Sequence, residues 1–226
     1  MARQLVFELG HRPASGRDDF LVAPSNEAAV ALIDAWPEWP DRIVALSGPA
    51  GSGKTHLAEV WRMASGAVTI APAALSDVDI PALVSRRAII LEDLTALPPQ
   101  GERFLFHLVN LVRAEGAFLL ITSRKALARL PLSLPDLTSR LKAVPQVELG
   151  PPDDALLAGI LVKLFDDRQL RVTPAVIAYL ASRIERSIDA ARAAVAELDT
   201  ASLSGKRSIT VPLAAEILGR QGEMPL

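Results

Sequence analysis

Short apolar runs alternate with longer helix-like segments between residues 43 and 149. The runs lie at residues 43–46, 68–70, 88–91, 118–121 and 147–149. Three of them are apolar at successive positions rather than at every second one, which indicates strands of a parallel sheet that are buried on both faces. The alternation is typical of βαβ units and predicts an α/β fold in which the intervening helices cover the sheet.

The pattern changes after Leu149, where Gly150-Pro151-Pro152 interrupts the alternation and only helical segments follow. Asp153 is a typical helix cap. The helices expected after it span residues 154–167, 174–183, 188–203 and 212–218. Near the other end a helix is expected at 28–36, stopped by Pro37, and a polar stretch at 11–19 follows a short apolar head. We therefore expect an N-terminal peptide with linker (residues 1–19), an α/β domain (20–150) and an all-helical domain (151–226).

Composition narrows the function classes. Half of the 226 residues are hydrophobic and 22% are charged, which suits a well-filled core. With 24 basic and 26 acidic residues the chain has no strong field for nucleic acid, so direct sequence-specific DNA binding is not expected. The absence of cysteine excludes disulfides and thiolate zinc sites. No apolar stretch or leader suggests a membrane span or a signal peptide, so the sequence predicts a cytoplasmic protein.

The strongest chemical signal is the segment GPAGSGKT at residues 48–55, which follows one apolar run and opens a helical segment. Its members are Gly48, Pro49, Ala50, Gly51, Ser52, Gly53, Lys54 and Thr55. This pattern is a P-loop, in which backbone N–H groups surround phosphates, the lysine reaches the outer phosphates and the hydroxyl binds Mg²⁺. The expected ligands are ADP or ATP with Mg²⁺.

Two further strands end in polar residues. Glu92-Asp93 follows an apolar run and is typical of a Walker B site, which holds Mg²⁺ and polarises water. Thr122-Ser123 ends the next run, where Thr122 either orients the attacking water or helps cap the segment before Arg124. Since the carboxyl ends of parallel strands share one edge, these groups should lie near Thr55.

Arg140 follows a short helix that starts at Pro135. It is interpreted as an arginine finger, a residue that stabilises transition-state charge on the γ-phosphate of a neighbouring molecule. The alternative is a surface arginine paired with Asp136 on the same helix.

Together these motifs resemble the AAA+ ATPases of the DnaA group, and most closely its Hda branch, whose members inactivate the bacterial replication initiator. The resemblance extends over nearly the whole chain. It rests on the P-loop with the following His56-Leu57, the acidic strand, the segment LLITS, the segment LPDLTSRL at 134–141 and the segment SITVP at 208–212.

The resemblance implies partners and residue roles. The peptide at residues 4–9 looks like one that binds the DNA polymerase III sliding clamp (its β subunit), with Gln4, Leu5, Phe7 and Leu9 as the contacts. DnaA would be the second partner, because Arg140 matches the finger offered to ATP held by DnaA. His56 joins the nucleotide-binding set, and Glu92, Asp93, Thr122 and Arg140 form the catalytic set. An apolar head could also pair between copies in a homodimer.

The chain departs from the family pattern at two positions. Glu92 stands where the family usually has aspartate, and Asp189 stands where a sensor arginine is expected, with Arg186 or Arg192 as substitutes about one turn away. These departures predict a protein that holds nucleotide and turns it over weakly. The rival hypotheses are an independent ATPase of the clamp-loader or helicase-loader type, a non-enzymatic adaptor, and a DnaA-like accessory factor that contacts DNA.

Overall fold

The computed structural model describes residues 21–205 and 207–221. The expected clamp-binding residues Gln4, Leu5, Phe7 and Leu9 lie outside these ranges. The described residues form two compact units: residues 26–150 make an α/β unit, and residues 151–221 make a helical unit together with residues 21–25.

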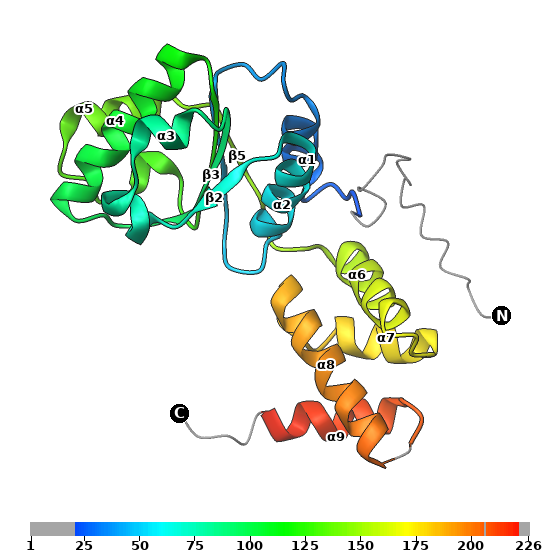
Figure 1. The fold of residues 1–226 in the computed structure, drawn as a ribbon. Helices are drawn as coiled ribbons and strands as arrows, with labels where there is room; N and C mark the ends of the chain where they lie inside the picture. The colour runs from blue at the N-terminus through cyan, green and yellow to red at the C-terminus, as the bar shows by residue number, and fades with distance from the viewer. Residues whose placement is uncertain (1–20, 206, 222–226) are drawn as a thin grey trace. The chain divides into compact units, whose positions relative to one another are not determined.

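The α/β unit is built on a five-stranded sheet whose pairings are all parallel (Figure 1). Its strands are β1 (Ile43–Ser47), β2 (Val68–Ile70), β3 (Ala88–Leu94), β4 (Phe118–Ser123) and β5 (Gln146–Glu148). The spatial order is β2-β3-β4-β1-β5, so the first strand of the chain lies inside the sheet. All five apolar runs therefore form strands, and the α/β prediction is confirmed.

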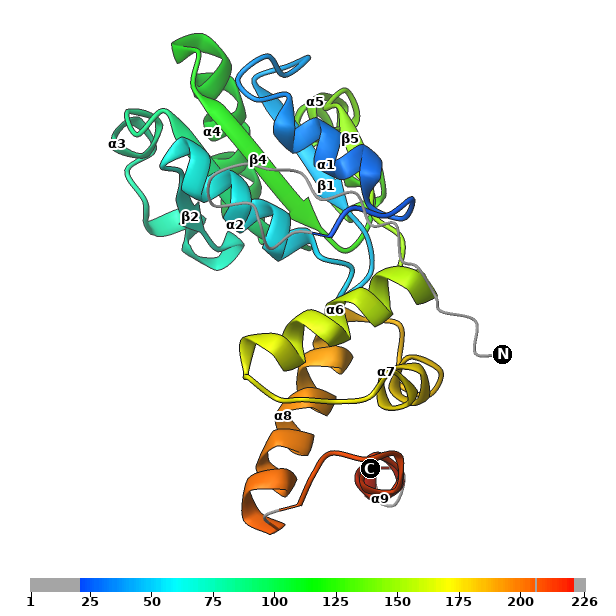
Figure 2. The ribbon, with the colours of Figure 1, turned by 90° about the vertical axis from the view of Figure 1, so that its right-hand side faces the viewer.

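Helices cover both faces of the sheet, which explains why its inner strands are apolar at successive positions. One face carries α1 (Glu27–Asp34) and α2 (Lys54–Ser65), and the other carries α3 (Ile80–Val84), α4 (Pro99–Glu115) and α5 (Pro135–Lys142), as Figures 1 and 2 show. Two short 3₁₀ turns, η1 (Pro72–Asp77) and η2 (Leu127–Arg129), complete the unit. Every residue of β1 is buried.

An aromatic cluster joins α1 and α2 to the start of β4. The ring of Trp39 stacks on that of Trp61 with centroids 4.9 Å apart, and both Trp36 and Trp39 meet the Phe118 ring edge to face. The Arg42 guanidinium lies 4.6 Å from the centre of the Phe118 ring. This cluster accounts for the two tryptophans that follow the first helix.

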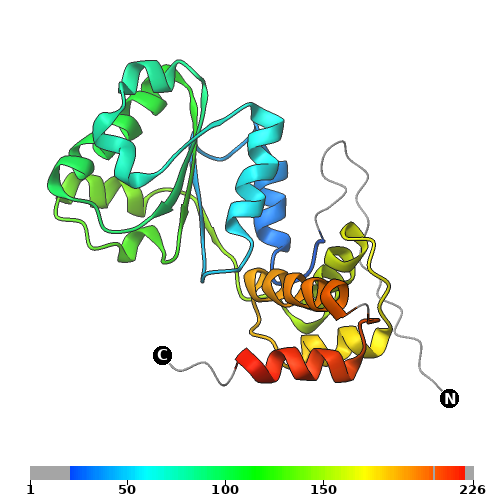
Figure 3. The ribbon, with the colours of Figure 1, turned by 60° about the horizontal axis from the view of Figure 1, so that its bottom comes forward.

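The helical unit consists of α6 (Asp154–Asp167), α7 (Pro174–Ala181), α8 (Ile188–Gly205) and α9 (Val211–Gln221). Figure 3 shows α8 in orange and α9 in red, which contact each other and share a core with α6 and α7. The carboxylate of Asp153 accepts a hydrogen bond from the Leu156 N–H at 2.8 Å, which confirms the predicted cap. No helix in the described part of the chain is long and apolar enough to cross a membrane.

Candidate functional site

Strand register brings three of the predicted motifs to one edge of the sheet. Ser47, the last residue of β1, pairs with Ser123 at the end of β4. Ser123 pairs in turn with Leu94 at the end of β3. The segments that leave β1, β3 and β4 therefore start side by side, at the carboxyl edge where open α/β sheets bind ligands.

The P-loop depends on glycine at its first position. Gly48 has φ +149°, and a Cβ atom built there would lie 2.3 Å from the carbonyl oxygen of Leu149. The Gly48 N–H donates to the Ser123 carbonyl at 3.2 Å, so the loop starts pressed between the ends of β4 and β5. Gly51 and Gly53 also have positive φ, at 68° and 100°, which non-glycine residues rarely adopt.

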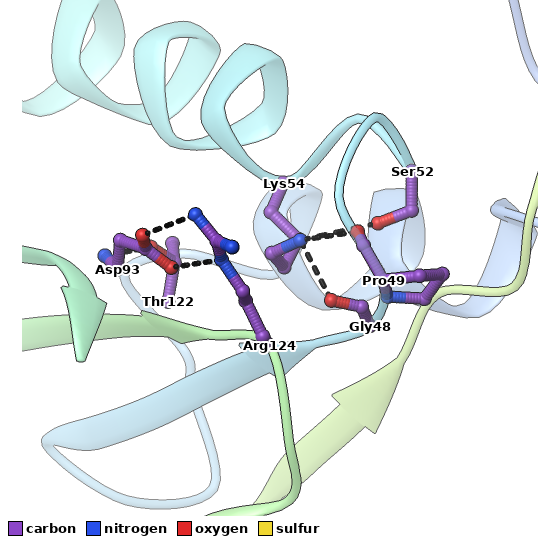
Figure 4. A network of polar contacts seen from close by, with 7 residues as sticks. All are labelled: Gly48, Pro49, Ser52, Lys54, Asp93, Thr122 and Arg124. Atoms are coloured by element: carbon purple, nitrogen blue, oxygen red, sulfur yellow. Dashed lines mark hydrogen bonds and ion pairs between the residues drawn. The ribbon is translucent and has the colours of Figure 1, made fainter. Parts of the chain in front are cut away.

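Lys54 folds back over the loop that precedes it. Its ammonium group donates to the carbonyl oxygens of Gly48 at 2.8 Å and Pro49 at 2.7 Å, and it lies 3.4 Å from the Ser52 hydroxyl (Figure 4). The side chain is 8% exposed. The loop thus holds a buried cation over its own backbone, which is the charge that phosphate oxygens require.

Helix α2 begins directly after the loop, with Gly53 as its N-cap residue. Among the described residues no side chain caps this end, so its first N–H groups and the positive end of the helix dipole face the loop. Thr55, in the first turn, is exposed, and His56 beside it is half-buried. Glycine turns, a buried lysine, the N-terminal end of a helix and the exposed hydroxyl residue Thr55 together fit a nucleotide phosphate chain.

The end of β3 is bulged toward the same edge. Leu91 pairs with Ile121 and Leu94 with Ser123, so Glu92 and Asp93 both lie opposite Thr122. Asp93 takes φ +54°, and its N–H donates to the Thr122 hydroxyl at 2.8 Å. Thr122 is 1% exposed and holds the acidic pair in place through this bond.

The two acids have different surroundings. Asp93 accepts two hydrogen bonds from the Arg124 guanidinium, at 3.3 and 3.1 Å (Figure 4). The half-buried Glu92 carboxylate has no hydrogen-bond partner among the described residues. Ser123 donates its hydroxyl to the Lys125 carbonyl at 2.6 Å and so shapes the turn that carries Arg124.

The residues present fit a magnesium ion that arrives with a nucleotide. Mg²⁺ at such sites uses one or two protein oxygens and takes the rest of its ligands from phosphates and water. Thr55, Glu92 and Asp93 are the candidate protein oxygens, as the sequence predicts. Within the described ranges there is no cluster of three or more His, Cys, Asp or Glu residues that could hold a metal by themselves.

Arg140 lies apart from this edge. Helix α5 leads into the start of β5, whereas the P-loop follows the end of the neighbouring parallel strand β1. Arg140 is exposed, and its guanidinium carbon lies 5.2 Å from the centre of the Phe106 ring on α4. No ion pair links it to Asp136, the alternative partner considered from the sequence. The arginine-finger role stays a prediction.

The sensor candidates lie at the start of α8, in the helical unit. Asp189 is exposed in the first turn of α8, where a negative charge suits the positive end of the helix dipole. The Arg186 guanidinium forms an ion pair with Asp154 at 2.8 Å, and Arg192 is exposed on α8. The choice between the two arginines stays open.

Two charged residues that form specific contacts in the structure were not predicted from the sequence. Arg124 pairs with Asp93 only because β3 and β4 are neighbours, which no local pattern reveals. Glu102 is 2% exposed on α4 and accepts hydrogen bonds from the segment before α5. The available signal was its place in the buried stripe of that helix, which continues through Leu105, Val109 and Val112.

Comparison with known proteins gives the site its context. Residues 154–218 match the family model "Hda, lid domain". An uncharacterised protein of Haemophilus influenzae is 28% identical over 182 residues, which cover 76% of this chain and 79% of the relative. Domain III of the Thermotoga maritima replication initiation protein DnaA superposes with TM-score 0.78 at 18% identity, over 92% of this chain and 98% of that one.

Two other solved structures share the fold at 16% identity. AMPPCP-bound DnaA from Aquifex aeolicus has a TM-score of 0.68 over 82% of this chain and 65% of its own. A Thermotoga maritima RuvB variant has a TM-score of 0.70 over 93% of this chain and 73% of its own.

A P-loop on a parallel sheet of this order, followed by a helical lid unit, is the fold of AAA+ proteins. The chain thus resembles DnaA domain III in its fold and the Hda family in its lid, residues 154–218.

Proposed function

We propose that this protein binds ADP or ATP with Mg²⁺ and promotes hydrolysis of the ATP held by DnaA, so that it negatively regulates the initiation of DNA replication. The observation that carries this proposal is the position of Arg140. It is an exposed arginine on a helix that leads toward the opposite edge of the sheet from the chain's own P-loop. A guanidinium so placed is available to a nucleotide on another molecule.

The relatives support an adenine nucleotide and a DnaA partner. One solved DnaA structure with this fold is bound to AMPPCP, an analogue of ATP. AAA+ proteins that share a fold can pack so that one supplies an arginine to the nucleotide of the next. The family match to the Hda lid favours DnaA as the neighbour.

Clamp binding is the second part of the proposal and rests on the N-terminal sequence. Gln4, Leu5, Phe7 and Leu9 would insert into an apolar pocket of the DNA polymerase III sliding clamp β subunit, as an extended peptide does in a groove. A clamp loaded on DNA would then concentrate this protein beside DnaA. Arg140 would stabilise the charge that develops on the γ-phosphate, and ADP-bound DnaA would be the product.

The chain's own turnover is expected to be weak. Glu92 replaces the usual aspartate, and the Arg124 guanidinium competes with magnesium and water for Asp93. A cytoplasmic location and a homodimer that hides the N-terminal peptide are further parts of the proposal, since both rest on sequence alone.

The test is conversion of DnaA-bound radiolabelled ATP to ADP in the presence of DNA-loaded clamp. The wild type should accelerate hydrolysis, and both Arg140→Ala and Gln4→Ala should reduce it toward the unstimulated rate. An arginine finger contributes roughly 10³ to 10⁵ in rate, so the Arg140 effect should be large. Lys142→Ala is the matched control, because it removes an exposed cation from the same helix.

Two outcomes would refute the proposal. Arg140→Ala as active as the wild type would leave DnaA-directed hydrolysis without its finger. Strong intrinsic turnover without DnaA, abolished by Lys54→Ala, would favour an independent ATPase of the clamp-loader type.

A further inference from the structure

A buried carboxylate on α4 holds the segment that starts α5. Glu102 is 2% exposed. Its two oxygens accept hydrogen bonds from the Ser133 N–H at 2.8 and 3.0 Å, and one of them accepts a third from the Leu134 N–H at 2.7 Å. An acid is rarely so buried unless its charge is used, and here two backbone donors use it.

One of these donors belongs to the N-cap residue of α5, and the other lies one residue before it. Leu134 is the N-cap residue of α5, and no side chain of its own segment caps the helix. Pro135, the first helical residue, has no N–H to offer. The Glu102 carboxylate therefore anchors the backbone where it enters α5, and its negative charge lies near the positive end of the α5 dipole.

The same face of α4 also contacts the far end of α5. Phe106 lies four residues after Glu102, one turn along on the same side of the helix. Its ring is the one that the Arg140 guanidinium covers, at 5.2 Å. Helix α4 thus contacts both the segment that enters α5 and the side chain of Arg140.

We propose that Glu102 is a positioning residue for Arg140: it fixes α5 on α4, with Phe106 as the second support, so that the guanidinium is held ready for a partner's phosphate. This inference rests on the proposed function of Arg140. Preorganisation of this kind matters because a small misplacement of a catalytic group lowers the rate far more than it lowers binding.

The first test needs no partner. Amide hydrogen exchange is measured on the full chain for wild type, Glu102→Gln and Glu115→Gln. The glutamine keeps the size of the side chain but replaces one acceptor by a donor, which faces the same N–H groups. Exchange in residues 133–142 should accelerate by about tenfold or more in Glu102→Gln while residues 48–65 keep their wild-type rates. Glu115→Gln makes the same charge change at the exposed end of α4 and should alter neither segment.

The second test is the DnaA-bound ATP hydrolysis assay, run as a titration of each variant. Glu102→Gln should lower the maximal stimulated rate by about tenfold or more, with little change in the concentration that gives half of it. In an Arg140→Ala background the same change should cause no further loss. Phe106→Leu should lower the maximal rate by about two- to fivefold, and Phe106→Trp, which keeps a ring under the guanidinium, should restore it.

The outcomes separate the two proposals. A fully active Glu102→Gln beside an inactive Arg140→Ala would overturn the positioning role and leave the proposed function intact. Equal rates for wild type and Arg140→Ala would overturn the proposed function, and with it any role of Glu102 in that reaction. If Glu102→Gln does not fold, an inactive Phe106→Trp would overturn the proposal, whereas restoration by that variant would support it.

Discussion

Arg124 and Asp93 form a two-point ion pair between the ends of β4 and β3, with Nε 3.3 Å from Oδ1 and Nη2 3.1 Å from Oδ2. Arg124 thus binds Asp93, the carboxylate that the sequence predicts to hold magnesium and polarise water. Its side chains are 62% and 45% exposed, so solvent screens the attraction and the pair can open at little cost.

Removing Arg124 should therefore strengthen magnesium-dependent nucleotide binding slightly. Arg124→Ala frees the Asp93 carboxylate, and we expect the affinity for Mg²⁺-ADP to rise by no more than about fivefold, since exposed pairs contribute about 0.2–1 kcal/mol. Isothermal titration calorimetry measures this change. Arg129→Ala, which removes an exposed cation from η2, is the control. A tenfold loss of affinity would instead mean that Arg124 binds the phosphates directly.

Gly48→Ala should be one of the most damaging single-methyl additions in the α/β unit. The new Cβ would lie 2.3 Å from the Leu149 carbonyl oxygen at φ +149°, so backbone has to move. We expect a loss of about 3 kcal/mol or more in the free energy of unfolding, measured by urea denaturation. Gly116→Ala isolates the cost of positive φ, because φ is +66° there and no atom of the described residues lies within 4 Å of a Cβ built at this position. It should cost only about 1–2 kcal/mol. Equal losses would show that the contact with Leu149 is easily relieved.

Removing either of two buried hydroxyl groups at the site edge should change the stability of the protein differently. Thr122→Val keeps the shape of the side chain but leaves the Asp93 N–H without its acceptor, at a cost of about 1–3 kcal/mol. Ser47→Ala removes a buried hydroxyl that has no hydrogen-bond partner in the described part of the chain, so stability should change by less than about 0.5 kcal/mol or increase. Thermal or urea unfolding of both variants tests the contrast, and a neutral Thr122→Val would contradict it.

The pKa of Glu59 should depend on its neighbour on α2. Two hydrogen bonds from the Arg62 guanidinium, at 2.6 and 2.7 Å, lower the pKa of the Glu59 carboxyl below its usual value. The stabilisation is present above the pKa of the unfolded chain and is lost as pH falls through the lower folded value. It should be small, because both side chains are 44% exposed.

Carboxyl NMR titration of the wild type and Arg62→Gln provides the measurement. The Glu59 midpoint should move upward in the variant. An unchanged midpoint would mean that the pair does not persist in solution.

The strands were predictable because buried parallel strands must be apolar at every position, and the runs at β1 and β4 need no tertiary information. The P-loop was predictable because its glycines carry a local backbone requirement. Other features depend on neighbours distant in sequence. Strand β3 continues to Leu94 because Glu92 and Asp93 bulge opposite Thr122, and that pairing is absent from any local pattern.

The ends of helices also depend partly on local sequence and partly on residues distant in the chain. The first helix was expected at 28–36 from the proline that follows it, whereas α1 spans Glu27–Asp34 and gives way to the turn before Pro37. The acid at Glu102 interrupts an apolar stripe, which signals a buried charge but not its partner. Its role becomes visible only when Ser133 and Leu134 are brought against α4.

The sheet order also determines when the nucleotide site can exist during synthesis. The Gly48 N–H donates its hydrogen bond to the Ser123 carbonyl, and Gly48 lies against Leu149, so the P-loop depends on strands that the ribosome makes much later. A growing chain contains the complete P-loop sequence long before β4 and β5 are synthesised. Until then both edges of β1 have no strand to pair with. Nucleotide binding should therefore begin only after β5 has been translated. Binding would then indicate that the α/β unit has folded completely.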